Sequence, residues 1–256
     1  MSLNPRIDNW TGRTMWLIGA SSGIGLATAS ALHAKGCRVI VSARSAPALQ
    51  AFVQAHPGSM ALPLDATDAS QVQSAAQQLA AQGRLDMVCY CAGYFRAMRA
   101  TDIDLPEVMR HLDINLRGAW HVIAAVAPTL CQQRSGHISL IGSVAGLRGL
   151  PESLAYGPTK AALSNLADAL HLDLRPLGIG VSIVTPGFVS TPLTASNDFP
   201  MPALMTPQQA AQALIRGWER GRFCIHFPKR FTRVVKLMSM LPDWLYFRLI
   251  HRATGL

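Results

Sequence analysis

Short apolar runs rich in β-branched residues alternate with stretches of helical periodicity along most of the chain. The apolar runs predict strands over residues 14–18, 37–41, 59–64, 85–91, 136–141, 179–184 and 222–227. Apolar residues at helical spacing predict helices over residues 24–35, 49–54, 69–82, 106–133 and 153–175. Because strands that alternate with helices need right-handed crossovers, they form a parallel sheet covered on both faces. We therefore expect an α/β fold, a single doubly wound domain over residues 1–256 with about seven parallel strands.

Two segments depart from this alternation. Residues 186–207 are rich in proline and have little periodicity, which predicts a loop that ends where Thr206, Pro207 and Gln209 open a last helix. Residues 228–256 form a basic, apolar extension. This extension fits a basic amphipathic element on a membrane surface, or a helix pair, broken at Pro242, that packs over a ligand pocket or another subunit. We favour the helix pair, because buried contacts are the commoner explanation of apolar residues.

Composition supports a globular domain with a substantial core. Half of the residues are hydrophobic and 14% are charged. The chain has no run of about 18 uncharged apolar residues, and its polar first residues do not resemble a secretory signal. The five cysteines, an odd number lying mostly in apolar stretches, predict free thiols in the reducing cytoplasm. Their spacing is not that of a metal site, so we expect no metal.

The net charge of +9 has three possible explanations: nucleic acid, an anionic membrane surface or a phosphorylated cofactor. Much of this charge lies between Arg216 and Arg252. Because no aromatic-and-basic RNA motif or helix-turn-helix signal is present, we expect no nucleic-acid partner.

A glycine-rich turn follows the first predicted strand. Residues 19–25 have the spacing G-x3-G-x-G, between a strand and a helix. Glycines in such a turn let the backbone approach a pyrophosphate, which then lies at the helix N-terminus, as in Rossmann-type domains. The turn therefore predicts a dinucleotide site that includes Gly19, Ser21, Ser22, Gly23, Ile24 and Gly25.

The end of the second predicted strand indicates which dinucleotide binds. NAD-binding folds usually have an acidic residue there for the ribose 2′-hydroxyl. This chain has Arg44 and no carboxylate in residues 42–45. A guanidinium can bind a 2′-phosphate through several donors, whereas a carboxylate would repel it. We therefore expect NADP (NADPH) rather than NAD, although Arg44 could also be a solvated loop residue.

The later part of the chain carries a set of residues in a recognisable order. Gly142-Ser143 is followed, thirteen residues after Ser143, by Tyr156-Gly157-Pro158-Thr159-Lys160. With the glycine turn, residues 90–93 and Asn115, this order resembles the short-chain dehydrogenase/reductase family over residues 14–227. That family has a T-G-x3-G-x-G turn, an N-N-A-G stretch, a helical Asn, a Ser and Y-x3-K.

The resemblance implies catalytic roles for four residues. Tyr156 would be the acid in carbonyl reduction and the base in alcohol oxidation, and Ser143 would hydrogen-bond the substrate oxygen. Tyr156 and Lys160, four residues apart, lie on one helix face, so the Lys160 ammonium would lower the pKa of Tyr156. Lys160 would also hold the nicotinamide ribose, and Asn115 would steady Lys160 through a water.

The resemblance also extends the cofactor site. Asp65 would contact the adenine edge, although it could equally cap the helix that begins near Ala69. Pro186, Gly187 and Thr191 would lie against the nicotinamide carboxamide. The other expected cofactor contacts are Ala92, Gly93, Tyr156 and Lys160.

Three positions depart from the family pattern. Ile18 replaces the threonine of the turn, and Tyr90 and Cys91 replace the paired asparagines. In the family these polar groups tie strands one and four together, so we expect an apolar substitute packing here.

In the family, the loop after Pro186 forms a substrate lid. Here residues 186–207 contain no Lys or Arg that could bind a carboxylate or a phosphate. The expected apolar lid residues are Phe188, Leu193, Phe199, Met201, Leu204 and Met205, and the pocket could also include Leu147, Leu150 and Leu154. An uncharged, hydrophobic carbonyl substrate fits best.

The sequence therefore predicts NADPH-dependent reduction of a carbonyl by hydride transfer, reversible as alcohol oxidation. The alternatives are a non-catalytic NADP-binding sensor or scaffold and a membrane-recruited partner protein. The resemblance implies a homodimer or homotetramer, formed through the helices over residues 106–133 and 153–175. Peripheral membrane contact would come from the C-terminal extension.

Overall fold

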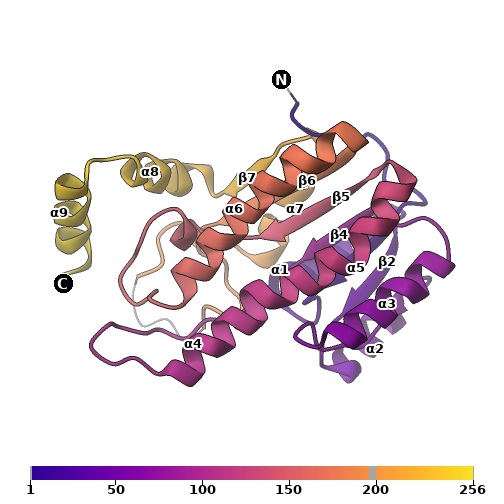
Figure 1. Ribbon diagram of the computed structural model, residues 1–256, viewed down its shortest axis with the longest axis horizontal. Coiled ribbons are helices and arrows are strands. Elements are labelled where there is room, and N and C mark those ends of the chain that lie inside the picture. Colours follow the sequence, from indigo (N-terminus) through magenta and orange to yellow (C-terminus); the bar gives the residue numbers. More distant parts are fainter. Residues whose placement is uncertain (1, 196–199, 256) are drawn as a thin grey trace.

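A computed structural model describes residues 2–195 and 200–255. Its centre is a parallel seven-stranded sheet in the order β3-β2-β1-β4-β5-β6-β7 (Figure 1). The strands are β1 Thr14–Ile18, β2 Arg38–Ser42, β3 Met60–Ala61, β4 Met87–Tyr90, β5 Gly136–Ile141, β6 Ile179–Pro186 and β7 Cys224–Phe227. The order reverses between β1 and β4, so this is the doubly wound fold predicted from the sequence.

Helices cover both faces of the sheet and bury one hydrophobic cluster on each. One cluster joins the sheet to α1 Gly23–His33, α2 Ala46–Ala55 and α7 Pro207–Glu219. The other joins it to α3 Ala69–Ala81, α5 Gly118–Gln133 and α6 Tyr156–Leu174. The strands are buried from both sides, which explains why they are continuous apolar runs rather than alternating ones.

The predicted third strand is longer than the observed one. Only Met60 and Ala61 pair with β2, whereas the sequence predicted a strand over 59–64. Pro63 has no backbone N–H for the ladder, so regular pairing ends before it. The Leu62 and Leu64 amides still donate to the Val41 and Ala43 carbonyls.

The helical region predicted over 106–133 is divided. It consists of α4 Leu105–Leu112, a π-helical turn η1 at Asp113–Arg117, and α5. Both ends of η1 continue in helical backbone, so the chain widens there without breaking. The helix predicted at Thr206 is present, and Thr206 and Gln209 cap each other reciprocally.

The C-terminal extension forms two helices, α8 Lys229–Ser239 and α9 Asp243–Thr254, with the break at Pro242 that the sequence predicted. They lie at one end of the molecule, beyond β7 and beside the loop that precedes α6 (Figure 1). None of the helices in the described part of the chain has the length and apolarity needed to cross a membrane.

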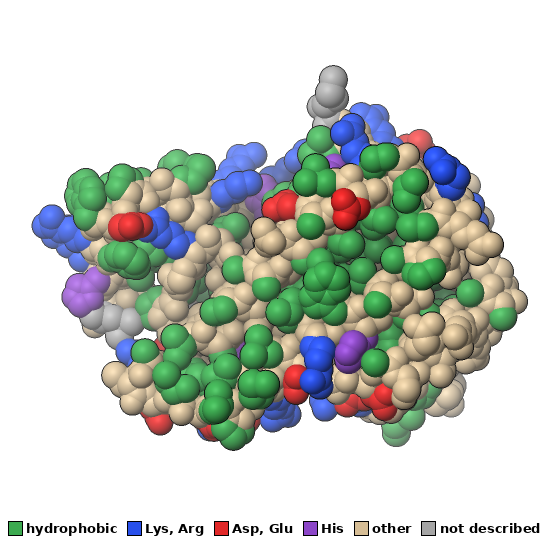
Figure 2. Space-filling model, in the orientation of Figure 1, with side chains coloured by type: hydrophobic (Ala, Val, Ile, Leu, Met, Phe, Trp, Pro, Cys, Tyr) green, Lys and Arg blue, Asp and Glu red, His purple; other side chains and the backbone are tan. Residues whose placement is uncertain are grey.

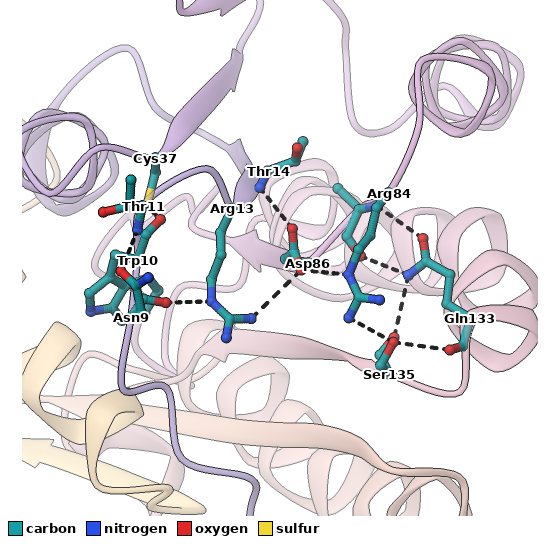
Figure 3. Close-up of polar contacts among 11 residues, drawn as sticks. Asn9, Trp10, Thr11, Arg13, Thr14, Cys37, Arg84, Asp86, Gln133 and Ser135 are labelled. Atoms are coloured by element: carbon teal, nitrogen blue, oxygen red, sulfur yellow. Dashed lines mark hydrogen bonds and ion pairs between the residues drawn. The ribbon is translucent and has the colours of Figure 1, made fainter.

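An ionic network fastens the amino ends of β1 and β4 (Figure 3). The Asp86 carboxylate accepts from the Thr14 amide at 2.9 Å and from Arg84 Nε at 2.8 Å, and it lies 3.6 Å from Arg13. The Asp86 side chain is only 9% exposed, which strengthens these contacts. Because ligands of such sheets bind at the carboxyl ends of the strands, this network belongs to stability rather than to binding.

Candidate active site

A cavity of about 1050 Å³ lies at the carboxyl ends of the strands, next to the point where the strand order reverses. Its wall takes residues from the turns that follow β1, β2, β4, β5 and β6, and from α8 and α9. This is the place where doubly wound sheets bind nucleotides. No group of His, Cys, Asp or Glu in residues 2–195 and 200–255 is arranged to hold a metal ion.

The glycine turn has the geometry of a phosphate-binding loop. Gly19 has φ +85°, and a Cβ there would collide with the Ala92 backbone. A Cβ on Gly25 would collide with the Gly19 carbonyl. Gly23 has φ +56° at the start of α1. Glycine is therefore required for the close approach of β1 to β4 and of α1 to its turn.

The N-terminus of α1 remains available to an anion. Ser22 caps the helix with extended backbone, but its side chain does not accept a helical N–H. First-turn N–H groups without a side-chain acceptor carry the positive end of the helix dipole. Together with the absence of Cβ atoms, this geometry fits a pyrophosphate. All six residues predicted for this part, Gly19, Ser21, Ser22, Gly23, Ile24 and Gly25, line the cavity.

Arg44 and Asp65 both line the cavity, and they follow two residues, Ala43 and Leu64, that are joined by a backbone hydrogen bond. Arg44 is exposed and its side chain forms no hydrogen bond or ion pair with the described residues, so its guanidinium is free to bind a ligand. Asp65 does not cap α3, since Asp68 does so by accepting from the Ser70 and Gln71 amides. The Asp65 carboxylate instead accepts from the Thr67 amide at 2.9 Å and from the Thr67 hydroxyl at 2.8 Å.

The remaining predicted cofactor positions form the middle of the cavity. Ala92, Gly93, Pro186, Gly187 and Thr191 all line it. A Cβ on Gly23 would lie 3.0 Å from the Thr191 methyl group, so the loop after β6 closes over the glycine turn.

Tyr156 and Lys160 lie in the first turns of α6 and face the cavity together with Ser143. A Cβ on Gly146 would lie 2.6 Å from the Lys160 carbonyl carbon, so only glycine lets the turn after β5 pack this closely on α6. Lys160 Nζ donates to the Ile141 carbonyl at 2.8 Å and lies 5.5 Å from the centroid of the Tyr156 ring. Phe95 contacts that ring edge-on, with 5.1 Å between the centroids.

The pKa of Tyr156 contradicts one expectation. We expected the Lys160 ammonium to lower it, but burial raises it to about 12, while a hydrogen bond with Ser143 acts in the opposite direction. Burial also lowers the pKa of Lys160 to about 8, which weakens the charge that would have favoured the phenolate. Tyr156 is therefore fully protonated at neutral pH in this structure.

Asn115 lies in the π-turn η1, behind the cavity wall rather than in it. Its Oδ1 accepts from the Tyr94 amide at 2.7 Å, and its Nδ2 donates to the Tyr94 carbonyl at 2.9 Å and to Thr159 Oγ1 at 3.1 Å. A Cβ on Gly93 would be 3.7 Å from Asn115 Oδ1 and 3.8 Å from Lys160 Nζ. Gly93 therefore lies between the two groups that a water was expected to join.

Ile18 and Tyr90 lie in one buried hydrophobic cluster and Cys91 packs against the other, as expected of an apolar substitute packing, but Tyr90 also adds a polar contact. The buried Tyr90 hydroxyl donates to the Ile114 carbonyl of η1 at 2.5 Å. β1 and β4 are joined instead by backbone pairing and by the Cys91 amide, which donates to the Ile18 carbonyl at 2.7 Å. Tyr90 thus connects β4 to the turn that contains Asn115.

The outer end of the cavity is mainly apolar. Phe188 and Leu193 of the predicted lid line it, whereas Met201, Leu204 and Met205 do not. Leu150 lines it too, whereas Leu147 and Leu154 do not. Phe199 lies outside the described residues. The C-terminal helices also form part of the wall, through Phe231, Val235, Met238, Tyr246 and Ile250.

The wall also contains a charged pair that has no signal in the sequence. Arg99 and Glu152 both line the cavity and form an ion pair at 2.8 Å. They are 53 residues apart and belong to different loops, so no local pattern joins them. The pair brings one positive and one negative charge together, so it adds no net charge to the wall.

Comparisons with known proteins agree with this arrangement. The family described as short chain dehydrogenase matches residues 13–200. An uncharacterized oxidoreductase of Myxococcus xanthus is 35% identical over 239 residues, which are 91% of this chain and 94% of that protein.

Two solved structures have the same fold. A short chain dehydrogenase from Burkholderia cenocepacia in complex with NADP has a TM-score of 0.84 and 20% identity, over 94% of this chain and 98% of that one. A short chain dehydrogenase/reductase from Burkholderia phymatum in complex with NAD has a TM-score of 0.83 and 22% identity, over 91% and 94%. The chain belongs to the short-chain dehydrogenase/reductase family of NAD(P)-dependent oxidoreductases.

Proposed function

We propose that this oxidoreductase reduces an uncharged, apolar aldehyde or ketone with NADPH. The observation that carries the proposal is that Ser143, Tyr156 and Lys160 line one cavity whose wall is mainly apolar. A carbonyl oxygen beside Ser143 and Tyr156 would leave the rest of the substrate against aromatic and aliphatic side chains. Such a pocket favours apolar ligands that carry a few polar atoms at a fixed position.

The residues divide the proton chemistry between them. A bound reduced nicotinamide supplies the hydride that the carbonyl carbon accepts. Tyr156 gives its hydroxyl proton to the substrate oxygen, and the raised pKa keeps that proton on Tyr156 until the transfer. Ser143 donates a hydrogen bond to the same oxygen as its negative charge develops. The ammonium of Lys160 favours the tyrosinate that remains, and solvent then reprotonates Tyr156.

The preference for NADPH rests on Arg44. Its guanidinium lines the cavity with no partner among residues 2–195 and 200–255, and no carboxylate lies beside it in residues 42–45. A charge-assisted bond to a 2′-phosphate contributes about 1.5–3 kcal/mol. Arg44→Ala should therefore raise the Kd of NADPH roughly 10–100-fold and change that of NADH little.

Fluorescence titration with both cofactors measures this shift. Arg38→Ala is the matched control, because Arg38 is an exposed arginine at the opposite end of the same strand. An unchanged ratio of NADPH to NADH affinity in Arg44→Ala would contradict the assignment of NADPH.

The substrate class is tested by NADPH oxidation with matched pairs of aldehydes or ketones. Each pair has equal chain length and differs by a terminal carboxylate. The uncharged member should have a kcat/KM at least about tenfold higher, because burying a carboxylate against a mainly apolar wall costs free energy. An equal or higher value for the carboxylate would contradict the proposed substrate class.

A further inference from the structure

The C-terminal helix pair has two faces with different surroundings. On α8, Phe231, Val235 and Met238 line the cavity. The same helix also exposes Val234 and Leu237 to solvent, and they are 56% and 62% accessible. α9 follows the same scheme, since Tyr246 is buried whereas Trp244 and Phe247 are exposed. The helix pair therefore presents apolar side chains both to the pocket and to solvent.

The exposed apolar side chains are concentrated there. Among the described residues, five of the thirteen exposed large hydrophobic side chains lie between Val234 and Phe247. They are Val234, Leu237, Met240, Trp244 and Phe247. Figure 2 shows hydrophobic and basic side chains interspersed at this end of the molecule. An apolar group of this kind on a surface is typical of a contact with another body.

Positive charge surrounds these side chains with almost no compensation. Residues 228–256 contain six Lys or Arg residues and one acidic residue, Asp243, which pairs with Arg148 of the body. The six cations form no ion pair with the described residues. They are Lys229, Arg230, Arg233, Lys236, Arg248 and Arg252.

The positive surface extends beyond the two helices. Arg222, and to a smaller extent burial, Arg233, Arg220 and Arg216, lower the pKa of Lys229. These cations are therefore close enough to repel one another in the free protein. A multivalent anionic surface would remove that repulsion.

We propose that the exposed face of α8 and α9 docks on an anionic lipid bilayer. Trp244, Phe247 and Leu237 would enter the boundary between headgroups and acyl chains, and the long Lys and Arg side chains would reach the lipid phosphates. The combination of a large aromatic residue with flanking cations is characteristic of such interfacial helices.

A second copy of the chain fits this face less well. In a twofold contact each copy would present the same cations to the other, and repulsion would oppose burial of the apolar residues. The proposal does not depend on the redox reaction, because it concerns binding alone. It does place the docked surface on the outer side of the pocket wall.

Vesicle sedimentation of the full-length protein tests the proposal. The protein should bind vesicles of phosphatidylcholine mixed with phosphatidylglycerol, and bind pure phosphatidylcholine vesicles more than about tenfold less. Raising the salt concentration should release it. Equal binding to both vesicle types, or none to either, would overturn the proposal.

Two double variants locate the contact. Arg233→Glu/Lys236→Glu and Leu237→Ser/Trp244→Ser should each reduce binding to anionic vesicles more than about tenfold. The matched controls are Arg38→Glu/Arg175→Glu and Leu172→Ser, which change exposed side chains on other elements and should bind as the wild type does. Circular dichroism establishes that each variant is folded.

Retained binding in both double variants would place the contact elsewhere and overturn the proposal. Analytical ultracentrifugation of the same variants addresses the competing occupant. If the substitutions in α8 and α9 abolish a wild-type oligomer while vesicle binding persists, this face joins copies of the chain and the proposal is wrong.

Discussion

Substitution of Arg148 by alanine tests how the C-terminal helices α8 and α9 are held over the cavity. It follows the short turn after β5, and its guanidinium donates to the Ser239 and Leu241 carbonyls at 3.3 and 2.5 Å. It pairs with Asp243 at 2.5 Å and lies over the Tyr246 ring at 4.0 Å from the centroid. One side chain thus contacts the end of α8, the connection, and the start of α9.

The cost of losing these contacts can be estimated. A hydrogen bond from a charged donor contributes about 1.5–3 kcal/mol, and the cation–π contact about 0.5–2 kcal/mol. The pair with Asp243 adds at most about 1 kcal/mol, because Asp243 is 86% exposed. Since such contributions are not additive, we take about 3 kcal/mol for Arg148→Ala, which corresponds to a roughly hundredfold shift between the docked and undocked states of α9.

This loss should remain local. In the described part of the chain, the other hydrogen bond between α9 and the body runs from the Tyr246 hydroxyl to the Gly149 carbonyl, at 2.7 Å. Arg148→Ala should therefore release α9 while the sheet and its two hydrophobic clusters stay folded. The KM for an apolar substrate should rise, because part of the pocket wall leaves.

Hydrogen exchange measured by mass spectrometry distinguishes local release of α9 from a loss of stability throughout the protein. Amides of residues 243–254 should exchange up to about a hundredfold faster in Arg148→Ala, with little change in the strands. Arg148→Lys is the control, since it keeps the charge but loses the planar fork of donors, and should show an intermediate effect. Unchanged exchange in α9, or equal acceleration throughout the protein, would refute this account.

Two further predictions concern stability. Burial, together with the charge of His171, lowers the pKa of His137 to about 3, whereas a histidine in the unfolded chain titrates near 6.5. Between these two pH values the unfolded chain binds one proton more than the folded protein. The free energy of unfolding therefore falls as the pH drops. The free energy of unfolding, measured with urea, should fall between pH 7 and pH 5 by about 2 kcal/mol less in His137→Gln than in the wild type, and an equal fall in both would contradict the assignment. Asp86→Ala should reduce the free energy of unfolding by about 1–3 kcal/mol, because Asp86 loses its hydrogen bonds to Thr14 and Arg84. The Kd of NADPH should not change, because Asp86 lies at the end of the sheet away from the cavity. A higher Kd of NADPH in the variant would contradict a purely structural role of Asp86.

Elements with strong local signals were predictable from the sequence. β5 has the predicted bounds, and α7 begins at the predicted cap, because apolar runs and capping residues act over a few neighbouring positions. The third strand was predicted at the right place but too long, although Pro63 marks its limit. Tyr156 and Lys160 are four residues apart, so their position on one helix face was also predictable from the sequence.

Features that depend on tertiary contacts were not predictable. The π-turn at Asn115 is joined to β4 by a hydrogen bond between Tyr90 and Ile114, which are 24 residues apart. The Arg99–Glu152 pair joins two loops that no motif relates. The direction of the Tyr156 pKa shift depends on burial, which a four-residue spacing cannot reveal.

The central claim, that Tyr156 delivers the proton in carbonyl reduction, is tested most directly by Tyr156→Phe. The substitution removes one hydroxyl and keeps the ring that contacts Phe95. NADPH oxidation with an uncharged ketone or aldehyde should fall by a factor of about 10²–10⁴ in kcat, while the Kd of NADPH measured by fluorescence changes only a few-fold. A variant that turns over at the wild-type rate would contradict the claim.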